Sequence, residues 1–188
     1  MRKLIVTTVA VFCLWSSGWA QSPPTSVTED IGKSVGKLRF ELVKIGVEPY
    51  ERHKSVAAEI RIFGPSSAKP VQTIETQIGI SNPHFSIADL NGDGFKDMIF
   101  YNDCAGFLPC FGPTIGADVY LYVPNLRQFV KSQTLSGRGE VVPSASKGCA
   151  EINYKSGPAG YTDETWCFNQ KTGRWKLVKS SGGEPDKD

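Results

Sequence analysis

The sequence predicts a mostly β protein of antiparallel sheets, arranged as a propeller-like fold or a sandwich, with one calcium-binding loop between two strands. Short apolar–polar alternations bounded by turn residues recur along the 188-residue chain between its two ends, and β-branched and aromatic side chains are common in them. No stretch keeps a helical period over three turns. These two observations favour strands over helices throughout the chain.

The N-terminus has the pattern of an export signal. Two basic residues precede an uncharged run from Leu4 to Trp15, and Gly18 and Ala20 provide the small residues of a cleavage site. We expect cleavage after Ala20 and a periplasmic or secreted product. A transmembrane anchor is disfavoured, because a membrane span needs about 20 apolar residues. Lipid attachment at Cys13 is disfavoured by the preceding Phe12, but that alternative stays open.

The net charge limits the kinds of partner, and the composition indicates the domain boundaries. Cleavage would remove two of the cations behind the net charge of +2, and the near-neutral product disfavours nucleic acid or an acidic membrane as a partner. We expect a signal peptide at 1–20, a linker at 21–36, a single β domain at 37–179 and a disordered tail at 180–188. At most, residues 26–36 could form a short helix. No membrane span follows the signal, and we expect a monomer.

The expected strands follow one another along the domain. In the first, Leu38, Phe40 and Leu42 alternate with more polar neighbours. An aromatic strand around Tyr120 and Tyr122 ends at a Pro-Asn turn and leads into a hairpin partner. The remaining runs of this kind lie at 56–63, 71–80, 128–135, 150–154, 164–168 and 175–178.

Four cysteines follow the signal, which predicts two disulfides in an exported protein. Cys149 and Cys167 lie symmetrically about a Gly-Pro-Ala-Gly turn, so two strands turning there would place them opposite each other. Cys104 and Cys110 would close a short loop. Binding of a metal by four thiols is the alternative, and the lack of a Cys-x-x-Cys spacing disfavours it.

The segment from Asp89 to Asp97 has the pattern of a calcium loop. Side-chain oxygens occur at loop positions 1, 3, 5 and 9, and calcium takes six to eight oxygen ligands. The alternative is a plain polar turn, since Asp, Asn and Gly are common in turns. The expected ligands are the side chains of Asp89, Asn91, Asp93 and Asp97 and the backbone carbonyl of Phe95.

Two further positions define the kind of loop. Gly94 at position 6 permits the sharp turn around the ion. Phe100 occupies position 12, where an EF-hand has Glu, so the EF-hand itself is excluded. Apolar residues on both sides of the loop place it between two strands.

The loop resembles the calcium loops of integrin α-chain propeller repeats, the FG-GAP type. A wider resemblance adds the aromatic strand Asp118-Val-Tyr-Leu-Tyr, the hairpin Arg127-Gln-Phe and the terminal hairpin Glu164-Thr-Trp-Cys-Phe with Trp175-Lys-Leu-Val. Together these features are similar to the periplasmic immunity proteins of Xanthomonas. That resemblance implies a calcium-binding protein that inhibits a peptidoglycan-cleaving, lysozyme-like hydrolase delivered by a type IV secretion system.

Inhibitors of lysozymes commonly present a loop to the catalytic carboxylates, so the resemblance points to two contact loops. One is the turn at 156–162, where Gly157, Gly160 and Tyr161 would contact the hydrolase. The other is the segment from Cys104 to Pro113, which carries Phe107. The alternatives are an ordinary surface turn and a cap on the core.

Catalysis is not expected. The two histidines, His53 and His84, accompany no nucleophile motif, although sequence leaves a pair of glycosidase carboxylates possible. The remaining alternative is a calcium-stabilised surface, adhesion or glycan-binding module without enzymatic activity.

Overall fold

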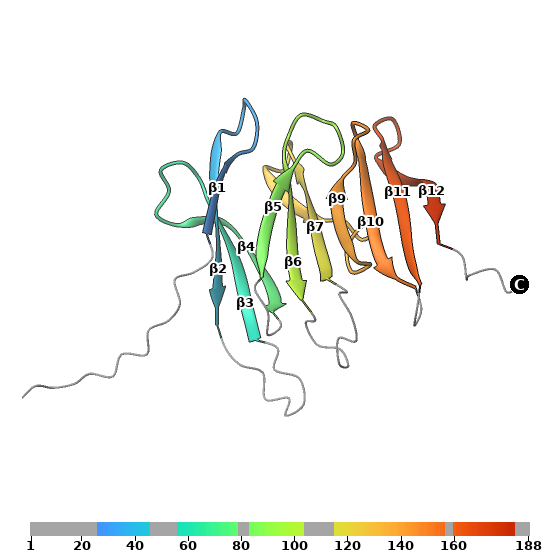
Figure 1. Cartoon of the computed structure of the whole chain (residues 1–188). Helices are drawn as coiled ribbons and strands as arrows, with labels where there is room; N and C mark the ends of the chain where they lie inside the picture. Colours follow the sequence, from blue (N-terminus) through green and yellow to red (C-terminus); the bar gives the residue numbers. More distant parts are fainter. Residues whose placement is uncertain (1–25, 46–55, 79–82, 104–114, 157–159, 183–188) are drawn as a thin grey trace, which may run out of the picture.

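The computed structural model describes residues 26–45, 56–78, 83–103, 115–156 and 160–182. Within these ranges the chain forms strands and no helix, and so contains no helix long and apolar enough to cross a membrane. Neighbouring strands are antiparallel and form three four-stranded sheets (Figure 1). The predicted fold class is therefore confirmed, as a sandwich-like arrangement.

Each sheet is a meander of four consecutive strands. The first contains β1 (Ser26–Asp30), β2 (Lys37–Lys44), β3 (Val56–Phe63) and β4 (Pro70–Ile78). The second contains β5 (His84–Ala88), β6 (Asp97–Asp103), β7 (Ile115–Val123) and β8 (Gln128–Lys131). The third contains β9 (Glu140–Pro143), β10 (Cys149–Lys155), β11 (Tyr161–Asn169) and β12 (Arg174–Ser181), with β12 at its edge.

The second sheet is the middle layer, and both of its faces are buried. Successive residues of a strand point to opposite faces. On β6, Met98 and Phe100 belong to the core shared with the first sheet, whereas Ile99 and Tyr101 belong to the core shared with the third. Their run of four buried side chains needs a covering sheet on each side, and full burial of such a side chain contributes about 1.5–3 kcal/mol.

The core between the first and second sheets is aromatic. Phe40 of β2 is fully buried and packs edge-on against Phe129 of β8, with ring centroids 5.4 Å apart. Gln72 of β4 both donates to the backbone oxygen of Phe129, at 2.8 Å, and accepts from its backbone nitrogen, at 2.9 Å. These contacts join the two layers at the β4–β8 edge.

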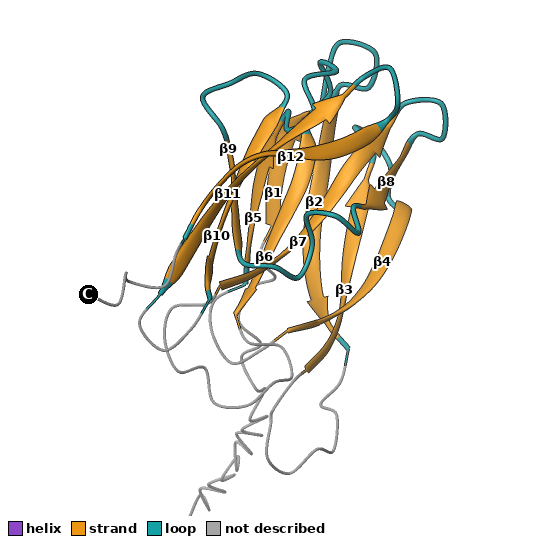
Figure 2. Ribbon diagram, turned by 90° about the vertical axis from the view of Figure 1, so that its right-hand side faces the viewer, coloured by secondary structure: helices purple, strands orange, loops and turns teal. Residues whose placement is uncertain are grey.

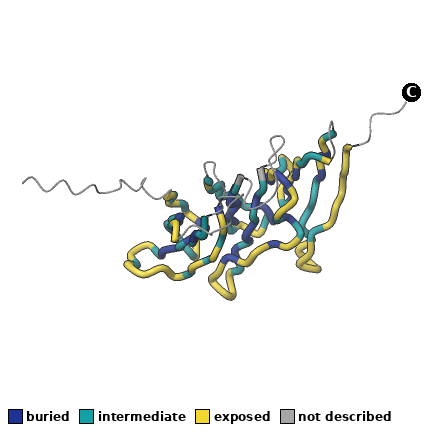
Figure 3. The backbone as a smooth tube through the Cα atoms, turned by 90° about the horizontal axis from the view of Figure 1, so that it is seen from below, coloured by how far each residue is buried: buried dark blue, intermediate teal, exposed yellow. Residues whose placement is uncertain are grey.

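The core between the second and third sheets is mainly aliphatic. Val119 of β7 packs with Leu135, Val141 and Ile152, all fully buried. The Tyr101 hydroxyl donates to the Val141 carbonyl at 2.6 Å, so its polar end is satisfied inside this core. In contrast, β12 is exposed along most of its length where it leads to the C-terminus (Figure 3).

Several expected boundaries differ from the structure. Residues 26–30 form β1 and not a linker or a short helix, because the strand pairs with β2 and Val27 packs against the first core. The hairpin partner expected at 128–135 ends as a strand at Lys131, since the chain then turns to bury Leu135. The strand β9 was not expected from the sequence, and β12 continues through Ser181 into the expected tail. The expected signal, residues 1–20, lies outside the described residues.

Candidate functional site

The predicted calcium loop connects β5 to β6 at the upper end of the sheets in Figure 1, the end at which several of the described loops lie (Figure 2). Three other turns lie beside it. The Lys96 amide donates to the Ile31 carbonyl at 2.8 Å in the β1–β2 turn, and the Gln170 side chain donates to the Asn91 carbonyl at 2.8 Å from the β11–β12 turn. A Cβ added to Gly92, which has a φ of +77°, would lie 3.0 Å from the Gly148 Cα of the β9–β10 turn. The loop is therefore enclosed by parts of the first and third sheets.

Inside the loop, side-chain oxygens accept hydrogen bonds from backbone amides. The Asp89 carboxylate accepts from Gly92 at 2.8 Å and from Gly94 at 3.0 Å. The Asn91 side-chain oxygen accepts from the Asp93 amide at 3.0 Å, and the Asp93 carboxylate accepts from the Phe95 amide at 2.8 Å. Such short-range bonds hold Asp and Asn turns in shape. These three predicted ligands thus also shape the loop.

Asp97 fastens the loop to the middle sheet. Its side chain is fully buried, and its two oxygens accept from the Leu90 amide and the Tyr122 amide, each at 2.9 Å. Burial raises the pKa of Asp97 from its usual 3.8 to about 7, these two amides lower it, and the nearby Asp93 raises it. Phe95 contributes its ring to the first core, 5.6 Å from the ring of Tyr122.

The donor set fits a hard cation in chemistry, with three carboxylates and one amide oxygen in nine residues. In the described ranges, however, no three Asp, Glu, His or Cys side chains form a group that could hold a metal ion as they stand. An ionised carboxylate has about four lone-pair sites. The one or two hydrogen bonds that each loop carboxylate accepts from backbone amides therefore leave acceptor capacity for an ion.

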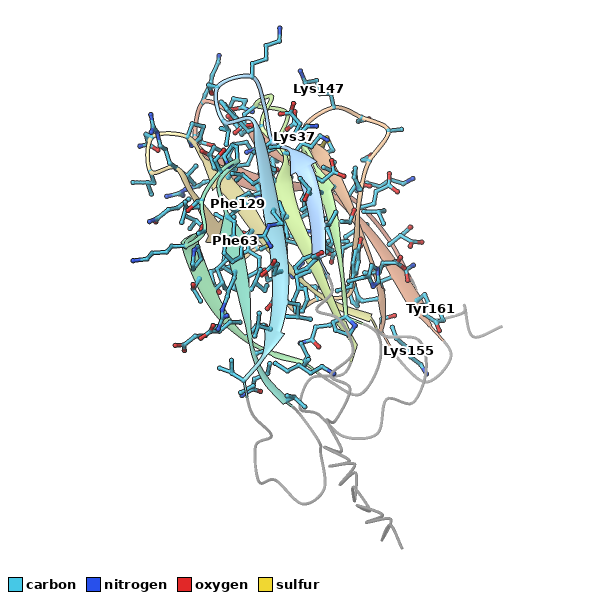
Figure 4. All side chains as sticks on the ribbon, turned by 90° about the vertical axis from the view of Figure 1, so that its left-hand side faces the viewer. Lys37, Phe63, Phe129, Lys147, Lys155 and Tyr161 are labelled. Atoms are coloured by element: carbon cyan, nitrogen blue, oxygen red, sulfur yellow. A yellow bond between two sulfur atoms is a disulfide. The ribbon has the colours of Figure 1, made fainter. Side chains whose placement is uncertain are left out.

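The predicted contact turn at 156–162 connects β10 to β11. Lys155 is paired with Tyr161 across the end of this hairpin, and the Ser156 amide donates to the Gly160 carbonyl at 3.0 Å. Figure 4 shows Lys155 and Tyr161 together at this end. Tyr161 is 45% exposed. Gly157 and the other contact loop, with Phe107, Cys104 and Cys110, lie outside the described residues.

The predicted bridge between Cys149 and Cys167 is confirmed, and the two residues are direct partners in the strand register. Five register pairs lie between the bridge and the Lys155–Tyr161 pair, so the two are six residues apart along β10, about 20 Å at strand spacing. The disulfide therefore joins β10 and β11 at the end of the hairpin that is far from its turn. This end of the third sheet lies beside the calcium loop, since Gly148 approaches Gly92 there.

A buried carboxylate near the hairpin turn was not predicted from the sequence. Glu164 of β11 is 8% exposed and accepts hydrogen bonds from Arg138 at 2.7 Å, Trp166 at 2.7 Å and Tyr154 at 2.9 Å. The signal that could have revealed it is the alternation of β11, which places Glu164 on the same face as Trp166. A carboxylate at an inward position requires such partners.

Comparisons with known proteins give one informative match. No family model matches the sequence, and no curated protein matches it. A solved structure described as that of a Xanthomonas type IV secretion system related protein is similar in fold, with a TM-score of 0.52. The similarity covers 86% of this chain and 88% of that chain, and the two are 14% identical in sequence. At this identity the similarity establishes a shared fold.

Proposed function

We propose that the chain is an exported inhibitor of a peptidoglycan-cleaving, lysozyme-like hydrolase and acts as an immunity protein without enzymatic activity. The observation that carries the proposal is the fold shared, over most of both chains, with a Xanthomonas type IV secretion system related protein. The sequence features between Phe85 and Val178 resemble those of Xanthomonas immunity proteins independently of that fold. The disulfide between Cys149 and Cys167 supports an extracytoplasmic location.

The contact surface in this proposal is the end of the β10–β11 hairpin, with Gly157, Gly160 and Tyr161, and Phe107 in the other loop. A tyrosine offers a large contact area, a hydroxyl group and few rotatable bonds, which suits it to an interface. The disulfide and the seven register pairs of β10 with β11 hold the hairpin in one register. A hairpin ordered before binding loses less conformational entropy on binding.

We further propose that calcium binds the loop, through Asp89, Asn91, Asp93, Asp97 and the Phe95 carbonyl. Bound there, the ion would neutralise the clustered carboxylates and brace the connection between β5 and β6. The loop lies at the other end of β10 and β11 from Tyr161. Its role in this proposal is therefore structural.

A glycan-binding module is the second candidate, and the small number of exposed aromatic side chains argues against it. Such a module would present several aromatic side chains on one face. In the described part of the chain, Tyr161 is the sole aromatic residue among the exposed large hydrophobic side chains. This distribution favours a single anchor at a protein interface over a platform for sugar rings.

The test is inhibition of cell-wall lysis. The purified protein is mixed with chicken-type, goose-type, invertebrate-type and bacterial muramidases, and the turbidity of a peptidoglycan suspension is followed. Inhibition of at least one enzyme is expected, with sub-micromolar affinity. Tyr161→Ala should weaken binding by about 2 kcal/mol or more, the threshold for an interface hot spot. Leu126→Ala, at a 57% exposed residue of another turn, is the control. Undiminished lysis across the whole panel would refute the proposal.

A further inference from the structure

The Glu164 cluster lies next to the hairpin turn and is not explained by the calcium loop or by the disulfide. Charged side chains are rarely this buried unless they are paired. Here a cation and two neutral donors share one carboxylate, and the Arg138 guanidinium carbon also lies 4.9 Å from the centre of the Trp166 ring. Hydrogen bonds to an ionised group are roughly twice as strong as neutral ones. The cluster is therefore a strong local restraint on β11.

Arg138 comes from a segment that is anchored on the middle sheet. We call residues 137–139 the strap. The Gly137 amide donates to the Ala117 carbonyl at 2.9 Å, and the Ala117 amide donates to the Gly139 carbonyl at 3.2 Å. Both ends of the strap are thus bonded to β7, while the Arg138 side chain reaches Glu164 in the third sheet.

The strap also lies directly against β10. A Cβ added to Gly139 would overlap the carbonyl oxygen of Asn153 and would lie 2.7 Å from the Tyr154 Cβ. Glycine is therefore required for the strap to come this close. The strap contacts Tyr154 through the backbone at Gly139, and Tyr154 itself donates to Glu164. Strap, β10 and β11 form one unit at this point.

This unit lies next to the end of the hairpin. Tyr154 is paired with Thr162, and the next pair along the strands is Lys155 with Tyr161. The disulfide is at the opposite end of these strands. Among the described residues, the Glu164 cluster is thus a side-chain link from the turn end of the hairpin to the strap and, through it, to the middle sheet.

We propose that Glu164 and Arg138 are positioning residues, which tie the hairpin to the middle sheet and set the direction in which Tyr161 meets its partner. The part of this inference that concerns the partner rests on the proposed function, whereas the tie itself does not. Without the tie, the hairpin end would sample more orientations. Apparent affinity falls in proportion to the fraction that is competent to bind.

The test compares local exchange with global stability. Amide hydrogen exchange is measured by NMR in Glu164→Gln and Arg138→Met, at the Ser156 amide of the hairpin and at the amides of β3 in the first sheet. Arg61→Met is the matched control, because Arg61 also pairs with a carboxylate, Glu59, at 2.8 Å. The two arginine side chains are similarly exposed, at 42% for Arg138 and 37% for Arg61.

Both cluster variants should accelerate exchange at Ser156 by about tenfold or more, with the β3 amides changed much less, as expected for the loss of a charge-assisted hydrogen bond. The control should change neither. Equal acceleration in the hairpin and in β3 would mean a general loss of stability and would overturn the inference, as would unchanged exchange at Ser156. If Glu164→Gln does not fold, Tyr154→Phe removes a single hydroxyl donor and keeps the ring.

A second measurement separates this inference from the proposed function. If the unaltered protein inhibits a hydrolase, both cluster variants should bind it about tenfold more weakly, and Arg61→Met should bind normally. Normal binding by the cluster variants would overturn the positioning role. If no hydrolase is inhibited by the unaltered protein, the proposed function fails, and the exchange comparison still decides whether the tie exists.

Discussion

The disulfide between Cys149 and Cys167 allows a quantitative prediction. The bridge joins residues 18 apart, and in the loop-entropy description a closed loop of this length contributes about 3 kcal/mol to the free energy of unfolding. Replacing both cysteines by alanine should lower stability by that amount. For a domain of this size, the loss corresponds to a fall in Tm of roughly 6–12 °C. The fold should persist, because β10 keeps its register with both β9 and β11.

The assay is urea unfolding followed by tryptophan fluorescence. Two of the four tryptophans lie in the predicted signal, so after cleavage the emission comes from Trp166 and Trp175, both in the third sheet. Circular dichroism on the same samples reports all three sheets. Coincident transitions displaced to lower urea are expected, and the other two cysteines are unchanged in this comparison. A loss below about 1 kcal/mol would refute the loop-entropy argument for this bridge.

The remaining predictions concern the metal and the core. The Tm should fall in EDTA and recover when calcium is added, and Asp93→Ala should abolish the recovery while Asp163→Ala, at an exposed strand residue, preserves it. An equal Tm with and without calcium would count against the site. Phe100→Ala, in the middle sheet, should cost about 3–5 kcal/mol in urea unfolding, since its side chain is fully buried. Arg61→Ala on the outer face should cost at most about 1 kcal/mol, and comparable losses for the two would contradict the three-layer arrangement.

The local sequence pattern was sufficient to predict most of the strands. The alternation of Leu38, Phe40 and Leu42 identified β2, because a half-buried strand repeats every second residue. The symmetry of Cys149 and Cys167 about a Gly-Pro turn identified their pairing, because antiparallel partners are equidistant from the turn. Both are properties of a few consecutive residues, so sequence alone contains them.

Local pattern is weaker in other strands. The polar sequence of residues 26–30 predicts a linker, whereas in the structure these residues pair with β2. Lys96 of the loop binds Glu29 of this strand by its ammonium group at 3.1 Å, and its amide donates to the carbonyl of Ile31, the residue after the strand. These long-range contacts stabilise an edge strand that has little hydrophobic pattern of its own. The strand β9 is four residues long, too short to show a clear alternation of its own.

The sequence by itself determined the class of fold, the position of the oxygen-rich loop between two strands and the partner of Cys149. These follow from residue period and spacing, which act over short distances along the chain. Only the tertiary structure decided that the second sheet is the middle layer, that Asp97 bonds to Tyr122 of β7, and that Glu164 pairs with Arg138. Each of these depends on which faces meet when the sheets stack. A strand's alternation marks its buried face but does not name the sheet that covers it.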